Sequence, residues 1–185
     1  MVPSLISHAI VAAGATRLVF GAGAPRAVYA AAVALSCLPD ADVIGFRLGV
    51  PYAAPWGHRG ASHSLVMAAI VSLPVAAALA RRHRGAAGAR RWPALWGFLF
   101  AAMASHGILD AFTSGGHGIA LLWPSSAERF FAPWRPIAVS PIGLSRFLSA
   151  RGVHVLASEA TVVWAPLAVT LAFAERFRSR RSRDR

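Results

Sequence analysis

The sequence predicts an all-α fold, a polytopic membrane helix bundle of about five transmembrane or membrane-embedded helices. Of its 185 residues, 56% are hydrophobic and only 14% are charged, a composition outside the range of soluble globular domains. Long stretches of the chain carry no charge at all, as membrane-embedded helices require. We expect residues 1–175 to form a single membrane-embedded domain and the basic tail, residues 176–185, to be disordered.

Five apolar segments correspond to the predicted helices. They cover residues 4–20, 27–39, 63–80, 92–114 and 154–174. Because a helix needs about 20 apolar residues to cross the hydrocarbon core, the last three segments are good candidates for complete spans. The segment 27–39 is short and spans only if its flanks extend it. Pro74 and Pro166 lie inside predicted helices, where neighbouring helices in a bilayer accommodate proline.

The distribution of arginine predicts the topology. Nineteen arginines and no lysine oppose seven acidic residues, for a net charge of +12. Two Arg-dense stretches, RRHRGAAGARR (81–91) and RFRSRRSRDR (176–185), flank apolar segments, and the positive-inside rule places both in the cytoplasm. We therefore expect these arginines to set the orientation in a bacterial inner membrane and to contact membrane lipids, with no nucleic-acid partner.

Alternating five spans from these two anchors brings the polar residues of the apolar segments to the periplasmic face. These residues are His8, Asp40, Asp42, His58, His63, His106, Asp110 and Glu159. Ionisable groups at membrane depth are energetically costly, so a set gathered at one depth predicts a functional site. The remaining histidines, His83, His117 and His154, lie in the basic loop or lack a partner at a useful spacing, and we expect them outside the site.

The residue types in this set are those of a divalent-metal site. In SHGILD, His106 and Asp110 are four residues apart and therefore lie on one helix face. LPDAD places Asp40 and Asp42 at a helix end, and the glycine of HRGASH lets both histidines of that motif turn inward. Nitrogen and oxygen donors without thiolate favour Zn²⁺, with Mn²⁺ or Mg²⁺ as alternatives, over copper(I) or an iron–sulfur cluster. The single cysteine, Cys37, is expected to be a small buried hydrophobe.

The motifs resemble those of the membrane-bound metal-dependent hydrolase family, whose enterobacterial representative is identified as an inner-membrane hydrolase under LexA control. The matching stretches are SHAIVAA, LPDAD, GHRGASHSL, SHGILDAFTSGGHGIALLWP and FFAPWRPIAVSPIG, which extend over about residues 4–145. The resemblance implies hydrolase chemistry and a divalent-metal site at His8, Asp40, Asp42, His58, His63, His106 and Asp110. A looser similarity to zinc-dependent phospholipases C departs from their later H-x3-E pair, because His154 and Glu159 are five residues apart.

The expected reaction is hydrolysis by water that a divalent ion activates. In this hypothesis Asp42 or Glu159 accepts the proton of the water, and Arg59 clamps an anionic group of the substrate. Phospholipids and lipid-linked phosphates at the outer leaflet are the natural substrates. Arg59 has a structural alternative, in which it anchors its loop by pairing with Asp40 or Asp42.

The sequence also suggests a helix cap, a lid or aromatic belt, and two alternative functions. Ser62 and Ser64 are expected to cap the helix that begins at His63. The loop 115–153 contains several Trp and Phe residues and is expected to form a lid or an aromatic belt. The rivals are a non-enzymatic metal-handling or transport protein and a haem-binding electron carrier, although the carboxylates favour a small cation over porphyrin iron.

Overall fold

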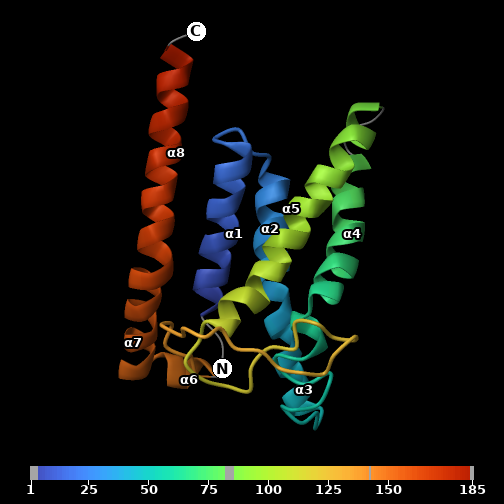
Figure 1. The fold of residues 1–185 in the computed structure, drawn as a ribbon, viewed down its shortest axis with the longest axis vertical. Helices are drawn as coiled ribbons and strands as arrows, with labels where there is room; N and C mark the ends of the chain where they lie inside the picture. The colour runs from blue at the N-terminus through green and yellow to red at the C-terminus, as the bar shows by residue number, and fades with distance from the viewer. Residues whose placement is uncertain (1–3, 82–85, 142, 184–185) are drawn as a thin grey trace.

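The computed structural model describes residues 4–81, 86–141 and 143–183, and the regular structure in these ranges is helical (Figure 1). The α-helices are α1 (Leu5–Phe20), α2 (Arg26–Cys37), α3 (Ile44–Arg47), α4 (Leu65–Arg81), α5 (Ala86–Ala111), α6 (Leu144–Phe147), α7 (Ala150–Glu159) and α8 (Ala165–Arg183). Short 3-10 segments cover Leu38–Val43 and Ala61–His63, and a π turn at Ala160–Trp164 joins α7 to α8. Isolated β-bridges are the only extended pairings in the described ranges. The predicted all-α fold is confirmed.

Three helical units are long and apolar enough to cross a membrane. They are Arg26–Arg47, Trp92–Ala111 and Ala150–Arg181. Helices α1 and α4 are also apolar, with 16 and 17 residues. The short segment predicted at 27–39 is extended at its C-terminal end by the 3-10 turn and α3, which together make a unit of 22 residues.

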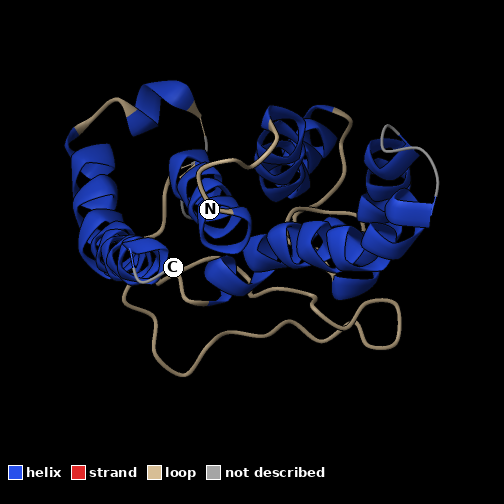
Figure 2. Cartoon of the chain, turned by 90° about the horizontal axis from the view of Figure 1, so that it is seen from above, coloured by secondary structure: helices blue, strands red, loops and turns tan. Residues whose placement is uncertain are grey.

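The apolar helices alternate in direction, so that one end of the bundle gathers the loops (Figure 1). The start of α1, the ends of α2 and α5, and the starts of α4 and α7 all lie at the lower end in Figure 1. The C-terminal end of α8 and the adjoining ends of α4 and α5 lie at the upper end. In the view from above, the helix that ends at the label C, α8, lies to one side, and long loops run along the edge of the bundle (Figure 2). The polar residues predicted to share one face therefore come from the same end of the molecule.

Small residues line the contacts between the central helices. The buried core includes Ala12, Ala32, Ala68, Ala76 and Leu99, contributed by α1, α2, α4 and α5. Alanine at a helix interface allows close approach of the backbones, which is the usual way in which helices pack in a bilayer. The same close approach brings the ends of α2, α4 and α5 together at the loop end, where the polar side chains lie.

Helix α8 packs against α1 along its length. A Cβ atom added to Gly14 would lie 2.7 Å from Leu167 Cδ2, so the two helices are in close contact there. Farther along, Arg17 Nη2 lies 2.6 Å from Glu175 Oε1, and Arg178 donates hydrogen bonds to the carbonyl oxygens of Arg17 and Leu18. These side-chain contacts help to hold the start of the tail in register with α1.

The tail is the main correction to the predicted fold. Residues 176–185 were expected to be disordered, but α8 continues through Arg183, and of this tail residues 184–185 lie outside the described residues. The physical reason is that Arg178 donates to the carbonyl groups of Arg17 and Leu18 at the end of α1, while arginine itself has a high helix propensity.

The alternation of the helices leads to a prediction about topology. We expect a reporter fused after Arg185 to be cytoplasmic and one inserted after Ala127 to be periplasmic. Ala127 is an exposed loop residue, whereas a side chain at Gly116 would place its Cβ 2.6 Å from Arg59 Nη1 and disturb the loop. Paired alkaline phosphatase and fluorescent-protein fusions measure the two sides. Reporters on the same side would contradict the five-span arrangement.

Candidate metal centre

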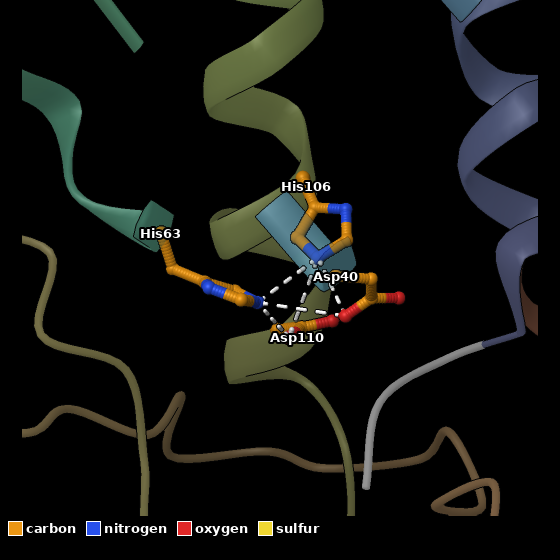
Figure 3. Close-up of side chains that lie close together, drawn as sticks. All are labelled: Asp40, His63, His106 and Asp110. Atoms are coloured by element: carbon orange, nitrogen blue, oxygen red, sulfur yellow. Dashed lines mark hydrogen bonds and ion pairs between the residues drawn. The ribbon is translucent and has the colours of Figure 1, made fainter. Parts of the chain in front are cut away.

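Four buried side chains point toward one another at the loop end of the bundle (Figure 3). Asp40 lies in the 3-10 segment after α2, His63 ends the 3-10 segment before α4, and His106 and Asp110 lie in the last turns of α5. One donor atom of each residue lies within 4.8 Å of those of the other three. None of the four residues is more than 7% exposed. The structure thus brings together four of the predicted metal ligands.

The separations between these donor atoms match those around one tetrahedral ion. His63 Nε2 lies 3.1 Å from His106 Nε2, 3.4 Å from Asp110 Oδ2 and 3.7 Å from Asp40 Oδ1. His106 Nε2 lies 3.3 Å from Asp40 Oδ1 and 3.8 Å from Asp110 Oδ2. Bonds of about 2.0–2.2 Å to a tetrahedral Zn²⁺ ion would put its ligand atoms about 3.3–3.6 Å apart. The centre of the four atoms therefore has the size of a small cation.

In both His63 and His106, the contacts of Nδ1 indicate that Nε2 faces the centre. His106 Nδ1 lies 2.7 Å from the carbonyl oxygen of Ser36, so it carries the proton and donates to that oxygen. His63 Nδ1 lies 3.2 Å from Asp42 Oδ2, where it can donate in the same way. Histidines that bind metals typically donate their other ring N–H to a carbonyl or carboxylate group. Both Nε2 atoms then turn lone pairs into the centre, where a cation between them would relieve their repulsion.

The carboxylate oxygens at the centre lack hydrogen-bond partners. Asp40 Oδ1 and both carboxylate oxygens of Asp110 are buried without a hydrogen-bond partner among the described residues. Buried carboxylates are costly without compensating positive charge, and Arg59 Nε, 3.5 Å from Asp110 Oδ2, supplies one such charge beside the two carboxylates. Burial by itself would lower the pKa of the His63 imidazole, but the neighbouring carboxylates of Asp110, Asp40 and Asp42 raise it well above its ordinary value. A divalent cation would satisfy the same preference for positive charge.

A second group, formed by Asp42, His58 and His63, also has ligand atoms close enough to hold an ion. Here Asp42 Oδ1 lies 2.6 Å from His58 Nδ1, and Ser62 Oγ donates to Asp42 Oδ2 at 2.6 Å. These are direct hydrogen bonds, shorter than the roughly 3.3 Å between neighbouring ligands of one ion. We therefore interpret Asp42 and His58 as groups that orient His63 from behind, a different role from the metal ligation predicted for them.

Burial also affects the ionisation of His58. It lowers the pKa of the His58 imidazole, and the hydrogen bond with Asp42 opposes this shift. A neutral imidazole donating from Nδ1 to the Asp42 carboxylate is consistent with both effects.

Ser62 and Ser64, both predicted to cap the helix that begins near His63, have different roles. Ser64 Oγ accepts from the amide of Met67 at 3.1 Å and caps α4, while Ser62 donates to Asp42.

Arg59 is fully buried beside Asp110. Its Nε lies 3.5 Å from Asp110 Oδ2, while Nη2 donates to Thr113 Oγ1 and Nη1 to the carbonyl oxygen of Gly115, each at 2.8 Å. The side chain therefore pairs with Asp110, and neither Asp40 nor Asp42 is its side-chain partner. Its backbone has a φ of 65°, a conformation that residues other than glycine rarely adopt. Because the guanidinium is enclosed, its place in this structure is that of an anchor for Asp110, not of an exposed clamp for substrate.

His8 is fully buried next to the group of four without belonging to it. Its ring stacks on His106, with ring centroids 3.7 Å apart and an interplanar angle of 16°. Its Nε2 lies 3.4 Å from Asp110 Oδ1. Neither ring nitrogen of His8 has a hydrogen-bond partner among the described residues. His8, which the sequence predicted as a metal ligand, therefore contacts the centre through Asp110 Oδ1, the oxygen that does not face the other three donors.

Glu159, the last residue of α7, contacts the start of α1 and lies outside both groups of potential metal ligands found among the described residues. Its carboxylate accepts hydrogen bonds from the Ser4 amide, the Ser4 hydroxyl and the Ser7 hydroxyl. Trp164 Nε1 donates to the same Ser7 hydroxyl at 2.7 Å. A negative charge at a helix N-terminus complements the helix dipole. Glu159 therefore joins the α7–α8 unit to α1, which differs from the general-base role predicted for it.

Replacing Glu159 is expected to reduce stability while leaving the metal in place. In Glu159→Ala, the Ser4 amide and two hydroxyls lose their acceptor, at a cost of about 3 kcal/mol or more. Thermal unfolding in detergent, together with metal analysis, measures both effects. Glu175→Ala is the control, because its half-exposed ion pair with Arg17 contributes about 0–1 kcal/mol. Loss of metal from a folded Glu159→Ala protein would instead connect this carboxylate to the centre.

Arg129 was missed by sequence reasoning. Its Nη1 donates to the carbonyl oxygen of His58 at 3.1 Å, and its Nη2 to those of Tyr52 and Ala54 at 3.3 and 3.1 Å. Burial lowers the pKa of this guanidinium and raises the pKa of the Tyr52 phenol. Arg129 thus ties the long loop after α5 to the loop that carries His58. The loop 115–153 contains four arginines, and nothing in the sequence distinguishes Arg129 from the others.

The other histidines lie apart from the centre where they are described. His117 packs its ring against Tyr52, with centroids 4.6 Å apart, and His83 lies outside the described residues. His154 lies in α7 and belongs to neither group of potential ligands.

Comparison with known proteins relates the chain to inner membrane proteins. Inner membrane protein YbcI of Escherichia coli (strain K12) is 42% identical over 170 residues, which cover 89% of this chain and 92% of the relative. No solved structure matches the chain. The family of YdjM inner membrane proteins matches residues 3–181, nearly the whole chain. Together with the three candidate spans, this match shows that the chain belongs to the YdjM inner membrane protein family.

Proposed function

We propose that this protein is a membrane-embedded, metal-dependent hydrolase. The observation that supports a metal most directly is the convergence of two imidazole nitrogens and two carboxylate oxygens. Each imidazole nitrogen lies 3.1–3.8 Å from the other three donors, and the carboxylate oxygens have no hydrogen-bond partner among the described residues. The hydrolase assignment rests on the donor types and on the order of motifs that the sequence shares with metal-dependent hydrolases.

Zn²⁺ is the ion that the centre suits best. Two nitrogen and two oxygen donors at tetrahedral spacing match its preferences, whereas Mg²⁺ prefers six oxygen ligands in an octahedron. Mn²⁺ is the alternative, because it accepts the same donors in a larger coordination number. When bound, such an ion supplies Lewis acidity, which activates water and polarises an ester.

The residues of the chain would then hold and orient this centre. Asp42 fixes the ring of His63 through Nδ1, and Arg59 fixes the carboxylate of Asp110. Among the four ligands, only the Asp40 side chain has any solvent exposure, at 8%. Water and substrate are therefore proposed to approach on the side of Asp40.

A phosphoester or lipid-linked phosphate at the periplasmic face is the proposed substrate class. Exposed apolar side chains are found in α3 and in the loops at the same end as the centre, including Ile44, Leu48, Trp56 and Trp134. Tryptophan and aliphatic side chains at a bundle end are typical of the membrane interface. A centre beneath such a surface is positioned to receive the headgroup of a lipid.

A non-enzymatic metal-handling role is the second candidate, and one observation favours it. Four protein ligands enclose a single buried position, and zinc sites closed in this way are usually structural, whereas catalytic sites keep one position open. A structural or transported ion would be bound without any hydrolysis.

A hydrolysis screen on the purified, Zn²⁺-loaded protein distinguishes the two functions. The panel consists of bis-p-nitrophenyl phosphate, p-nitrophenyl phosphate, p-nitrophenyl acetate and phosphatidylglycerol vesicles, with His106→Ala as the background control. Turnover of a phosphoester above that control supports the hydrolase. Stoichiometric metal without turnover of any member of the panel would favour the metal-handling role.

A further inference from the structure

We infer that the centre holds a second divalent cation, between His8 Nε2 and Asp110 Oδ1, so that the Asp110 carboxylate bridges two ions. This inference rests on the first ion of the proposed function, which would occupy the position between Asp40, His63, His106 and Asp110. The second position uses the other oxygen of Asp110 and a histidine from a different helix, α1.

The first ion leaves a particular set of buried polar atoms without partners. One ion among the four ligands would satisfy Asp40 Oδ1 and Asp110 Oδ2. Asp110 Oδ1 and both ring nitrogens of His8 remain buried and unpartnered among the described residues. Buried polar atoms nearly always have a partner, so this remainder itself indicates a missing ligand.

The separation of these atoms also indicates a cation. His8 Nε2 lies 3.4 Å from Asp110 Oδ1, which is longer than the 2.7–3.2 Å of an ordinary N–H···O bond. It falls within the 3.1–3.8 Å range that separates the donors of the first ion. By contrast, Asp42 Oδ1 and His58 Nδ1 meet directly at 2.6 Å, and that pair already satisfies itself.

His8 is held in place for such a role. Its ring is stacked on His106 at 3.7 Å, and its backbone carbonyl accepts a hydrogen bond from Ser36 Oγ at 3.1 Å. The start of α1 is itself tied to Glu159 through Ser4 and Ser7. A ligand whose ring plane and backbone are both fixed binds an ion without a further loss of conformational entropy.

The two positions differ in the number of protein ligands. The first has four, whereas the second has only His8 and Asp110, both fully buried, so its remaining coordination positions would be filled by water or substrate that enters past Asp40. Catalytic ions keep such open positions, and hydrolases with two metals place them about 3.5–4 Å apart. An ion held by four protein ligands beside an ion held by two would explain how an enclosed first site is compatible with hydrolysis. The first ion would organise the centre, and the second would contact a phosphoryl oxygen of the substrate.

Metal stoichiometry tests this inference independently of activity. The full-length protein is purified in detergent, equilibrated with Zn²⁺, desalted and analysed for zinc per chain. His8→Phe is the main variant, because it keeps an aromatic ring to stack on His106 while removing both nitrogens. His8→Ala is the second variant, and His117→Ala is the control, since His117 contacts Tyr52 away from the centre. Thermal unfolding establishes that each variant is folded.

We expect two ions per chain in the wild type and the His117→Ala control, and one in both His8 variants. In Mn²⁺-loaded protein, we expect the spin-coupled EPR signal of a metal pair, lost in His8→Phe. One ion in the wild type and one in His8→Phe would overturn the second position and leave the proposed function standing. Two ions in folded His8→Phe would place the second ion elsewhere. No ion in the wild type would overturn the second position and the proposed metal centre together.

Discussion

Replacement of His106 or Asp110 by alanine is expected to release the bound metal. Asp110→Ala also leaves the buried Arg59 guanidinium without its partner, so it is expected to be the less stable of the two variants. Each residue contributes a donor atom to the group of four, and Asp110 lies within 3.8 Å of the donor nitrogens of His63, His106 and His8. Loss of a residue that only orients a ligand typically costs 10–100-fold in affinity, so loss of a ligand itself should cost at least about 100-fold. Zinc per chain, measured after desalting, should fall to less than about a tenth of the wild-type value.

Membrane insertion of these variants should be unchanged, because α5 remains apolar over Trp92–Ala111. Asp110→Asn is the matched variant: it keeps the size of the side chain and removes its charge, and we expect it to lose metal as well. His117→Ala should retain wild-type metal. If His106→Ala holds as much metal as the wild type, the assignment of the centre is wrong.

Replacement of Arg59 by alanine is expected to destabilise the fold strongly and to weaken metal binding. The guanidinium is fully buried beside Asp110, and it donates to Thr113 and to the Gly115 carbonyl. Removing one partner of a buried ion pair typically costs about 3–5 kcal/mol, because the remaining charge is left unpaired. Thermal unfolding in detergent and zinc analysis should both show the change.

Two further variants separate the causes of this effect. Arg59→Gly removes the same side chain and suits the φ of 65°, so it isolates the contribution of the side chain from that of the backbone. Arg47→Ala is the control, because Arg47 is exposed in α3. A stable Arg59→Ala protein that keeps its metal and loses about 100-fold in turnover would instead support the substrate clamp that the sequence suggested.

The elements predicted well are those that depend on neighbours in the chain. Apolar length predicted the membrane helices, and the four-residue spacing of His106 and Asp110 correctly placed the pair on one turn of α5. The 3-10 turn and α3 lengthen the segment 27–39, an outcome that the sequence left open. The tail was predicted wrongly because its order comes from α1, whose terminal carbonyls accept from Arg178.

Within the site, the sequence identified the side chains that could bind a metal, but it could not show which of them face the same position. Asp40 and Asp42 are two residues apart and chemically alike, yet Asp40 faces the centre while Asp42 lies behind His63. A 3-10 turn, with about three residues per turn, points such neighbours in different directions, and only the packing of the histidine loop decides which one meets the ion. Glu159 shared the expected depth, but its carboxylate contacts the start of α1.

By itself, the sequence determined the apolar helices, their alternation and the stock of nitrogen and oxygen donors at one end, because hydrophobic length and helical spacing are local properties. The tertiary structure decided which donors share a position, that Arg59 pairs with Asp110, and that His8 reaches the second oxygen of Asp110. Those contacts join residues 51 and 102 positions apart in the chain, and their distances depend on how whole helices pack, which no local pattern encodes.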